Sequence, residues 1–553
     1  MEKQRRVIMK IFKLLGTKKA ASLGLALTLG VTMLTGCGGG KKAAPGGGGA
    51  GAGKPLFIGL TNAPSGFNPL LAPDIVAQTA NRFMYDTLVG QPEPNKFTPH
   101  LADSIETKDK QTYTIKLNPK AKWTDGKPVT ADDVVFTFNL IANPKVETSR
   151  GGYIMMLEGV DNNGKLKNGG TIAGLKALDA TTVQFKCKRP VDPNFVKGLL
   201  GFNVPIVPKH VFSTIEPSKL SSSPKVTQPS VTCGPYKYVK YVTNDHLEMA
   251  ANDAYYRGAP KIKKVFMKIQ NGTNLVVDLK AGKIQMAAGG GIGVVPIKDI
   301  ETLKSDSKLV VEGYPATAAQ FMEINNQNPA FNVHFRRAMT MAIDRQKLVD
   351  QLYKGYAKIF PTLYTAASPV YDPSVKPLSY DPEGAKKELA QSGYDVSKEL
   401  VLQVPIGNIL REQSADLIQQ NLQAIGLKVK TQKYDFPTIL SNARKGNYEL
   451  LLLGLNCAID PDYLTYYLKG SASDFSLTDD AKLNDLFAKG SSLTSFEERK
   501  PVYGEIQKYM RDMQFNTTLY AQDYFKAQSK NLVGGVKPYW EGSFDDMHTW
   551  YFK

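Results

Sequence analysis

A β-α-β-α-β pattern between residues 381 and 455 constrains the fold of this chain most strongly. Short apolar or alternating runs, which are typical of strands, are interspersed with stretches that repeat apolar side chains at helical spacing. Asp381-Pro382 reads as the cap and first residue of the first helix, and Gly393 as its stop. The predicted strands are 400–404, 427–432 and 449–455, and the later predicted helices are 411–425 and about 436–445.

This pattern predicts an α/β fold with a mainly parallel sheet that is buried on both faces. Ligands of such sheets bind outside the carboxyl ends of the strands. The loop at 456–461, which follows the last predicted strand, is therefore the first place where we expect function.

No catalytic signature accompanies this sheet. The chain has no Gly-x-Ser-x-Gly elbow and no Gly-x-Gly-x-x-Gly after a strand, and no pair of carboxylates stands out for acid–base work. The glycine-rich run at 289–293 breaks the dinucleotide pattern, because Pro296 stands where its last glycine belongs. It predicts backbone close to a ligand or a domain crossover, or else a plain turn. We expect no enzymatic activity.

The N-terminus carries much of the positive charge. The formal net charge is +18, and the first 36 residues hold seven Lys or Arg and one acid, Glu2. Residues 20–34 form an apolar run shorter than the roughly 20 residues of a spanning helix, which is typical of a secretory signal peptide. Residues 34–37 resemble the lipobox of bacterial lipoproteins, in which the final cysteine, here Cys37, is diacylated and becomes the first mature residue.

We therefore expect a signal peptide over 1–36, followed by lipidated Cys37 and a flexible Gly-rich tether up to residue 54. The alternative is an ordinary signal peptide followed by an unmodified thiol. The expected mature protein is extracytoplasmic and held to a membrane by its lipid, either in a periplasm or on a cell surface.

Removal of the signal peptide takes away six net positive charges and leaves +12 on the mature chain. No remaining segment is a Lys/Arg tract with interleaved aromatics, so we expect no nucleic-acid partner. Cys187, Cys233 and Cys457 are odd in number and lack Cys-x-x-Cys spacing, and the five histidines are scattered singly. We accordingly expect no metal site and no cofactor.

At the level of motifs, the mature chain resembles family 5 of the extracellular solute-binding proteins, the oligopeptide- and dipeptide-binding lipoproteins of bacterial ABC importers. The signature region contains Trp123, an Asp125-Gly126 turn and Thr130, which we expect to hold a hairpin–helix junction rather than to touch ligand. The matching blocks, in family order, are 101–104, 113–117, 123–134, 234–236, 252–256, Asn325, 335–338, 342–345, 380–382 and 425–427.

The resemblance implies a two-lobed, type II periplasmic-binding-protein clamshell with an additional third domain. It implies a monomer that captures oligopeptides between its lobes and delivers them to a membrane permease. Alternatives are the same role for a metal chelate or an oligosaccharide, an exported lipid-anchored hydrolase, or a surface receptor. The implied boundaries are 55–98, 228–312 and 519–553 for lobe I, 99–227 for the additional domain and 313–518 for lobe II.

One departure from the family concerns the ligand's amino group. In peptide-binding relatives, an aspartate three residues before an Asp/Glu-Pro pair binds the α-ammonium. Here the pair is Asp460-Pro461, and the residue three positions earlier is Cys457. Either Asp460 or Asp462 replaces the missing carboxylate, or the ligand has no free amino terminus at this place.

The candidate ligand-binding residues lie in loops after the first strand, in the additional domain, in the glycine run and after the last strand. Each has a structural alternative as an ordinary loop residue. Asn325 and Arg336 are expected to fix the start of lobe II instead. The candidates are Asn62, Ala63, Ser65, Tyr153, Met155, Gly291, Asn456, Cys457, Ala458, Asp460 and Asp462.

Overall fold

The structure is a computed structural model of the whole chain, and it describes residues from 53 onward. The residues outside the described part are 1–52, 73, 149, 168, 291, 316–317, 457–474, 536 and 538–541. The predicted signal peptide and Cys37 lie outside it. Within the described part, no helix has the length and apolar character needed to cross a membrane.

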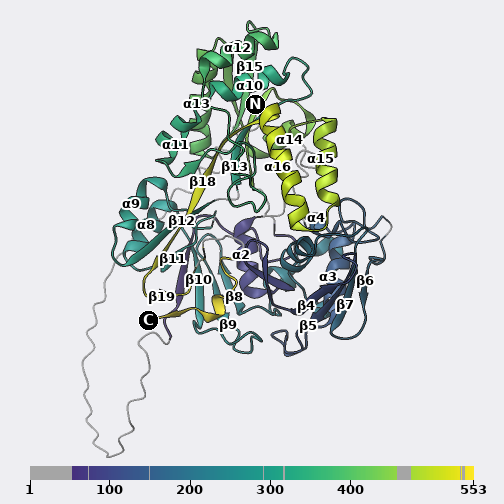
Figure 1. Cartoon of the computed structure of the whole chain (residues 1–553). Coiled ribbons are helices and arrows are strands. Elements are labelled where there is room, and N and C mark those ends of the chain that lie inside the picture. Colours follow the sequence, from purple (N-terminus) through teal and green to yellow (C-terminus); the bar gives the residue numbers. More distant parts are fainter. Residues whose placement is uncertain are drawn as a thin grey trace, which may run out of the picture. The chain divides into compact units, whose positions relative to one another are not determined.

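Twelve strands form the main sheet (Figure 1). Its path runs β16-β15-β17-β13-β18-β11-β1-β10-β9-β8, and β12 and β14 both pair with β18 beside that path. The strand bounds are β1 Leu56–Leu60, β8 Tyr236–Val242, β9 His246–Ala251, β10 Lys264–Ile269, β11 Met286–Ala287, β12 Leu309–Pro315, β13 Ala318–Ile324, β14 Ala357–Lys358, β15 Glu399–Pro405, β16 Lys428–Tyr434, β17 Leu450–Asn456 and β18 Asn516–Ser529.

A separate four-stranded antiparallel sheet has the order β4-β5-β7-β6. Its strands are β4 Ala102–Thr107, β5 Thr112–Leu117, β6 Leu175–Ala177 and β7 Thr182–Lys186. Two further sheets have two strands each: one pairs β2 (Val89–Glu93) with β3 (Lys96–Pro99), and the other pairs β19 (Leu532–Val533) with β20 (Tyr551–Phe552).

The α-helices surround these sheets. Their bounds are α2 Ile75–Met84, α3 Ala131–Ala142, α4 Gly151–Ile154, α5 Pro193–Val196, α6 Lys209–Phe212, α7 Pro224–Thr227, α8 Gly272–Lys280, α9 Ile300–Lys304, α10 Val333–Ala342, α11 Arg345–Tyr353, α12 Pro382–Ser392, α13 Ile409–Ala424, α14 Phe436–Lys445, α15 Ala481–Ser492 and α16 Phe496–Met513.

The predicted β-α-β-α-β unit is confirmed as α12-β15-α13-β16-α14-β17, and β15 pairs in parallel with both β16 and β17. Asp381 caps α12 by accepting the Gly384 N–H, and Gly393 ends it in the left-handed conformation. Burial on both faces is wrong for β16, because this strand forms the edge of the sheet and is mostly exposed. Beyond β17 the sheet continues with antiparallel pairs, which the local pattern did not predict.

Strand β18 joins two halves of the main sheet. Its first part, residues 516–520, pairs with β13, and its last part, residues 523–529, pairs with β12 (Figure 1). We call the part with β1, β8–β12 the β1 half and the part with β13, β15–β17 the β15 half. In the sequence, β12 of the β1 half is followed directly by β13 of the β15 half.

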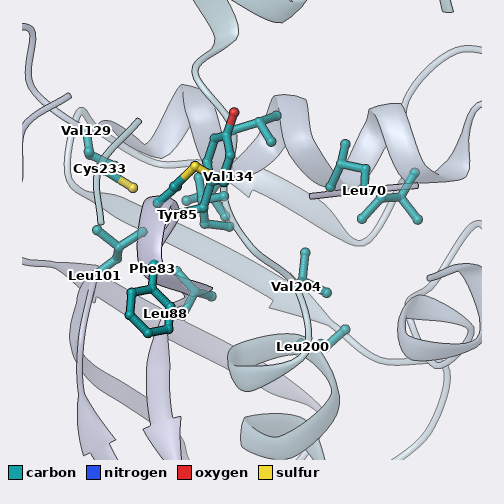
Figure 2. Packing of buried hydrophobic residues seen from close by; sticks show 14 of the residues in the cluster. Leu70, Phe83, Tyr85, Leu88, Leu101, Val129, Val134, Leu200, Val204 and Cys233 are labelled. Atoms are coloured by element: carbon teal, nitrogen blue, oxygen red, sulfur yellow. The ribbon is translucent and has the colours of Figure 1, made fainter. Parts of the chain in front are cut away.

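The hydrophobic cores follow this division. One cluster contains Leu56 of β1 together with Tyr113 and Phe185 of the four-stranded sheet, so that sheet shares a core with the β1 half. Figure 2 shows part of this cluster, including Tyr85, Val129 and the Cys233 thiol. Cys187 and Cys233 are both buried and free. Two other hydrophobic clusters lie in the β15 half, and the second of them contains buried side chains of α15 and α16.

The signature residues of the hairpin–helix junction hold one another, as the sequence predicts. Trp123 is 2% exposed, and its indole N–H donates to Asp133 Oδ2 at 3.2 Å. The same oxygen accepts the Thr130 backbone N–H at 2.9 Å, which completes a capping box at the start of α3. Gly126, at φ +87°, makes the preceding turn.

Candidate functional site

The loop after β1 lies against the glycine-rich run. Thr61 donates its N–H to the Ile292 carbonyl at 2.7 Å, and its hydroxyl accepts the Val294 N–H at 3.3 Å. Asn62 and Ala63 follow directly, so two of the predicted ligand segments meet here. Gly291 itself lies outside the described residues.

The glycines on either side of Gly291 have a structural role. Gly289 has φ +74°, and a Cβ on it would lie 2.4 Å from the Phe525 carbonyl oxygen. A Cβ on Gly293 would lie 2.5 Å from the Gly59 carbonyl oxygen of β1. These contacts favour close backbone packing within the β1 half as the reason for both glycines.

A buried arginine joins the loop after β1 to the segment around α4. Arg150 Nε donates to the Pro69 carbonyl at 2.7 Å, and its Nη1 donates to the Asn203 carbonyl. Burial lowers the pKa of Arg150 to about 10. Tyr153 is half-buried against the core of the β1 half, and Met155 follows α4 directly. The loop after β1 and the loop of the additional domain, which were both predicted to bind ligand, are therefore neighbours.

Ser65, by contrast, is exposed and has a local role. Its N–H donates to Asp74 Oδ2 at 3.1 Å, and Asp74 also caps α2. This contact belongs to a helix start and neither requires nor excludes a ligand.

The carboxyl ends of β15, β16 and β17 meet at one edge of the β15 half. The Ile406 N–H, just after β15, donates to the carbonyl of Tyr434 at the end of β16 at 2.9 Å. Asn456 ends β17 opposite Ala318 of β13. The predicted site residues Cys457, Ala458, Asp460 and Asp462 lie outside the described residues, as does the side chain of Asn456.

The sequence prediction missed one residue at this edge, Arg411, in the first turn of α13. Its Nε and Nη2 donate to Gln320 Oε1 of β13 at 3.0 and 2.9 Å. Gly454 of β17 leaves room for that amide, since a Cβ there would lie 2.4 Å from Gln320 Nε2. Burial lowers the pKa of Arg411, and no carboxylate of the described residues forms an ion pair with it.

A sequence signal for Arg411 did exist. The first turn of a helix carries the positive end of the helix dipole, where acidic residues are favoured and a cation is not. Among the described residues, the only hydrogen-bond acceptor of the half-buried Arg411 guanidinium is the Gln320 amide oxygen, and a guanidinium is a group that binds anions well.

A second polar cluster lies in the β1 half around His100, which is not the isolated histidine that its sequence context predicts. His100 Nδ1 lies 2.6 Å from Asp86 Oδ1, and its Nε2 lies 3.0 Å from Asp545 Oδ1. The hydroxyls of Tyr255 and Tyr256 donate to Asp86 Oδ2 at 2.8 and 2.7 Å. Among the described residues, no group of His, Cys, Asp and Glu has the arrangement of a metal site.

Comparison with known protein families shows to which family the chain belongs. The family model described as bacterial extracellular solute-binding proteins, family 5 Middle, matches residues 96–476, more than half of the chain. The chain belongs to this family. The resemblance predicted from the sequence motifs is thereby confirmed.

This family 5 protein is similar to several characterised relatives. The oligopeptide-binding protein AppA of Bacillus subtilis (strain 168) is 26% identical over 513 residues, which cover 87% of this chain and 90% of AppA. The ABC transporter substrate-binding protein CtaP of Listeria monocytogenes matches in structure with a TM-score of 0.78 and 26% identity, over 91% of this chain and 99% of CtaP.

Two further structures show the same fold at lower identity. AppA of Bacillus subtilis, solved with a nonapeptide, has a TM-score of 0.75 at 23% identity and covers 91% of this chain and 99% of AppA. NikZ of Campylobacter jejuni, solved with Ni(L-His), has a TM-score of 0.71 at 21% identity and covers 90% and 99%. These matches confirm the predicted fold class, the type II periplasmic-binding-protein clamshell with an additional domain.

Proposed function

We propose that this solute-binding protein captures oligopeptides and delivers them to the permease of an ABC importer. The observation that carries the proposal is Arg411, a half-buried guanidinium without a carboxylate partner among the described residues. It lies at the carboxyl edge of the parallel strands, where such sheets bind ligands. The terminal carboxylate of a peptide would supply the missing charge.

The energetics favour an anionic ligand end. A half-buried cation whose acceptor is a neutral amide is stabilised when a carboxylate replaces water beside it, because a charge-assisted hydrogen bond is stronger than a neutral one. Loss of one partner from such a desolvated pair costs about 2–5 kcal/mol of binding free energy. The carboxylate is therefore expected to contribute a large share of the affinity.

Binding by closure of two lobes fits the connections of the main sheet. β18 pairs with strands of both halves, and β13 of the β15 half follows β12 of the β1 half in the sequence, which is the connectivity expected of a hinge. In this proposal lobe I comprises 55–98, 228–312 and 519–553, lobe II comprises 313–518, and 99–227 form the additional domain. A ligand that shifts the chain from mostly open to mostly closed must prefer the closed state by about 10⁴-fold.

The amino end of the ligand is assigned to the loop after β17. In this proposal Asp460 or Asp462 binds the α-ammonium in place of the aspartate missing at Cys457. The curated relative AppA is named an oligopeptide-binding protein, and this supports a peptide as ligand.

A metal chelate is the second candidate ligand. NikZ was solved with Ni(L-His), whose histidine also carries a carboxylate that an arginine would recognise. A chelate brings its own ligands to the metal, so it needs no metal site in the protein.

Lipidation of Cys37 completes the proposal, because an anchor and a Gly-rich tether keep the protein close to its permease. Palmitate labelling of the wild type that disappears in Cys37→Ser is the expected result. Unchanged labelling of the variant would exclude Cys37 as the anchor.

Isothermal titration with tri- to pentapeptides tests the ligand assignment. Each peptide is used unmodified, N-acetylated and C-amidated, with Ni(L-His) as the competing ligand. We expect C-amidation and Arg411→Met each to weaken binding at least tenfold, and amidation to have little further effect in the variant. Arg337→Met is the matched control, since Arg337 lies in the same half and pairs with Glu388.

Three outcomes would contradict parts of the proposal. Equal affinity for amidated and free peptides would exclude Arg411 as the carboxylate receptor. Equal affinity for acetylated and free peptides would exclude an ammonium anchor at Asp460 or Asp462. Binding of Ni(L-His) alone would replace peptide by chelate as the ligand, and cleavage of the peptides, seen by mass spectrometry, would indicate a hydrolase.

A further inference from the structure

Polar contacts connect the four-stranded sheet to the turn between α15 and α16. Two cations and one carboxylate on the sheet side meet two backbone carbonyls, a hydroxyl and an arginine on the helix side. We call this set the α15–α16 bridge. It consists of Lys110, Arg189 and Asp192 on one side and Ser491, Thr494 and Arg499 on the other.

The sheet side of the bridge is held rigidly. Lys110 has φ +57°, which is uncommon for a non-glycine residue. Asp109 Oδ1 fixes this turn by accepting the Gln111 and Thr112 N–H groups at 2.9 and 2.7 Å. The buried Tyr113 hydroxyl donates to the carbonyls of Lys110 and Val191, so the turn before β5 and the segment after β7 form one unit.

The two cations meet the end of α15. Arg189 Nη1 donates to the Ser491 carbonyl in the last turn of α15 at 2.5 Å. Lys110 Nζ donates to the Thr494 carbonyl and hydroxyl at 3.3 and 3.0 Å. The negative end of the helix dipole favours cations at this place.

The carboxylate meets the start of α16. Asp192 Oδ2 lies 3.5 Å from Arg499 Nη1, and the Arg499 side chain is 1% exposed. Asp192 also caps α5 by accepting the Asn194 N–H, which fixes its orientation. The charges on the two sides of the bridge are therefore complementary: cations meet a helix C-terminus and a carboxylate meets an arginine.

The bridge crosses the boundary between the two halves. Tyr113 and Val191 belong to the core that the four-stranded sheet shares with β1, whereas Leu483 of α15 and Tyr503 of α16 belong to a core of the β15 half. The exposed contacts of the bridge, such as Arg189 with Ser491, break and re-form in water at little cost, whereas the buried Asp192–Arg499 pair costs more to separate. This is the composition of an interface that opens and closes.

We propose that the α15–α16 bridge is a latch for the closed state, with Lys110, Arg189, Asp192 and Arg499 as positioning residues that never touch ligand. The latch sets how often the ligand-free protein is closed, and this fraction scales the apparent ligand affinity. The inference rests on the hinge closure proposed above. It does not depend on the ligand being a peptide.

Single-molecule FRET on the ligand-free protein tests the latch. Dyes are attached through keto amino acids at Lys176 on β6 and Lys387 on α12, which are both exposed, so the native cysteines stay unchanged. Because Arg499 is buried, its substitution risks misfolding, and the test uses the surface variant Lys110→Ala/Arg189→Ala. The matched control is Lys108→Ala/Lys188→Ala, which removes two neighbouring lysines outside the bridge.

We expect the latch variant to raise the ratio of open to closed molecules roughly three- to tenfold, as the loss of one exposed and one partly buried charged contact predicts, and the control to leave it unchanged. Added salt should open the wild type more than the latch variant, because it screens the same contacts. A ligand-free wild type that is wholly open, equal ratios in wild type and latch variant, or an equal response to salt would each overturn the proposal. Failure of all peptides to bind would leave this measurement intact.

Discussion

The buried His100 cluster makes the stability of this protein depend on pH in a direction that can be worked out. His100 and Asp86 are 7% and 5% exposed, and each ring nitrogen of His100 faces a carboxylate. Burial alone lowers the pKa of His100, but the charge of Asp86, the hydrogen bond to Asp86 and the close carboxylate of Asp545 outweigh it, and the pKa is raised. Burial likewise opposes the shift of Asp86, whose pKa falls well below its usual range because of His100 and Arg257.

The signs of these shifts fix the pH window. A raised histidine pKa contributes stability that is fully present below the unfolded-state pKa of about 6.5 and is lost as pH rises through the folded pKa. A lowered aspartate pKa contributes stability that is present above about 3.9 and is lost as pH falls through the folded pKa. The cluster is therefore expected to stabilise the protein most between about pH 4 and pH 6.5 and less at pH 9.

The perturbation is His100→Gln, which removes the positive charge and leaves two buried carboxylates facing a neutral amide. Removal of one partner from a buried charge pair costs about 3–5 kcal/mol. Arg257, whose Nη2 lies 3.7 Å from Asp545 Oδ2, and the two tyrosine hydroxyls on Asp86 remain and should keep the loss toward the lower end of that range. His246→Gln is the control, since His246 pairs only with the exposed Asp245.

Urea unfolding of both variants and the wild type at pH 6 and pH 9 measures the effect. We expect His100→Gln to be less stable than the wild type at both pH values, with the larger difference at pH 6. The control should follow the wild type. A difference between His100→Gln and wild type that does not change with pH, or that is larger at pH 9, would refute a charged His100 in the folded state.

Two further substitutions probe the junction and the ligand edge. Asp133→Asn replaces the carboxylate that accepts both the indole and the cap N–H, and we expect urea unfolding to show a loss of about 2 kcal/mol, with little change for the exposed neighbour Asp132→Asn. A stability equal to wild type would mean that the capping box does not hold the junction. Gly454→Ala should displace Gln320 and with it Arg411, which donates to the Gln320 amide oxygen. We expect peptide affinity in titration to fall about tenfold. The control Gly504→Ala on α16 should leave the affinity unchanged. Unaltered affinity in Gly454→Ala would separate this amide from ligand binding.

The parts of the fold that the sequence predicts well are those that local patterns specify. The α12 cap at Asp381 and its stop at Gly393 are set by single residues, and the strands β15 and β17 by short apolar runs. The antiparallel pairing of β13 with β18 depends on residues almost 200 positions apart, such as Met322 and Thr517, and no local period reports it. The predicted burial of both faces of β16 was wrong for the same reason, since the position of a strand at the edge depends on the whole sheet.

The site shows the same limit. The meeting of the loop after β1 with the glycine run was predicted only as a set of separate loops, because the Thr61–Ile292 contact joins residues 231 positions apart. Arg411 was missed because its burial and its Gln320 partner, 91 positions away, exist only in the folded chain. A cation in the first turn of a helix was the one local sign of it.

The distribution of apolar and polar contacts shows how the proposed closure would be compatible with a stable chain. Within each half, buried side chains such as Tyr113 in the first and Tyr503 in the second interlock in close-packed cores, which do not slide or separate in small steps. Between the halves, the α15–α16 bridge consists of charges, carbonyls and a hydroxyl, and its exposed members can be satisfied by water after the contact opens. An apolar patch in the same place would make the open state expose that surface to water and would trap the protein closed. In the latch proposal, the polar composition of the bridge is therefore what leaves a ligand able to decide the balance between the open and closed states.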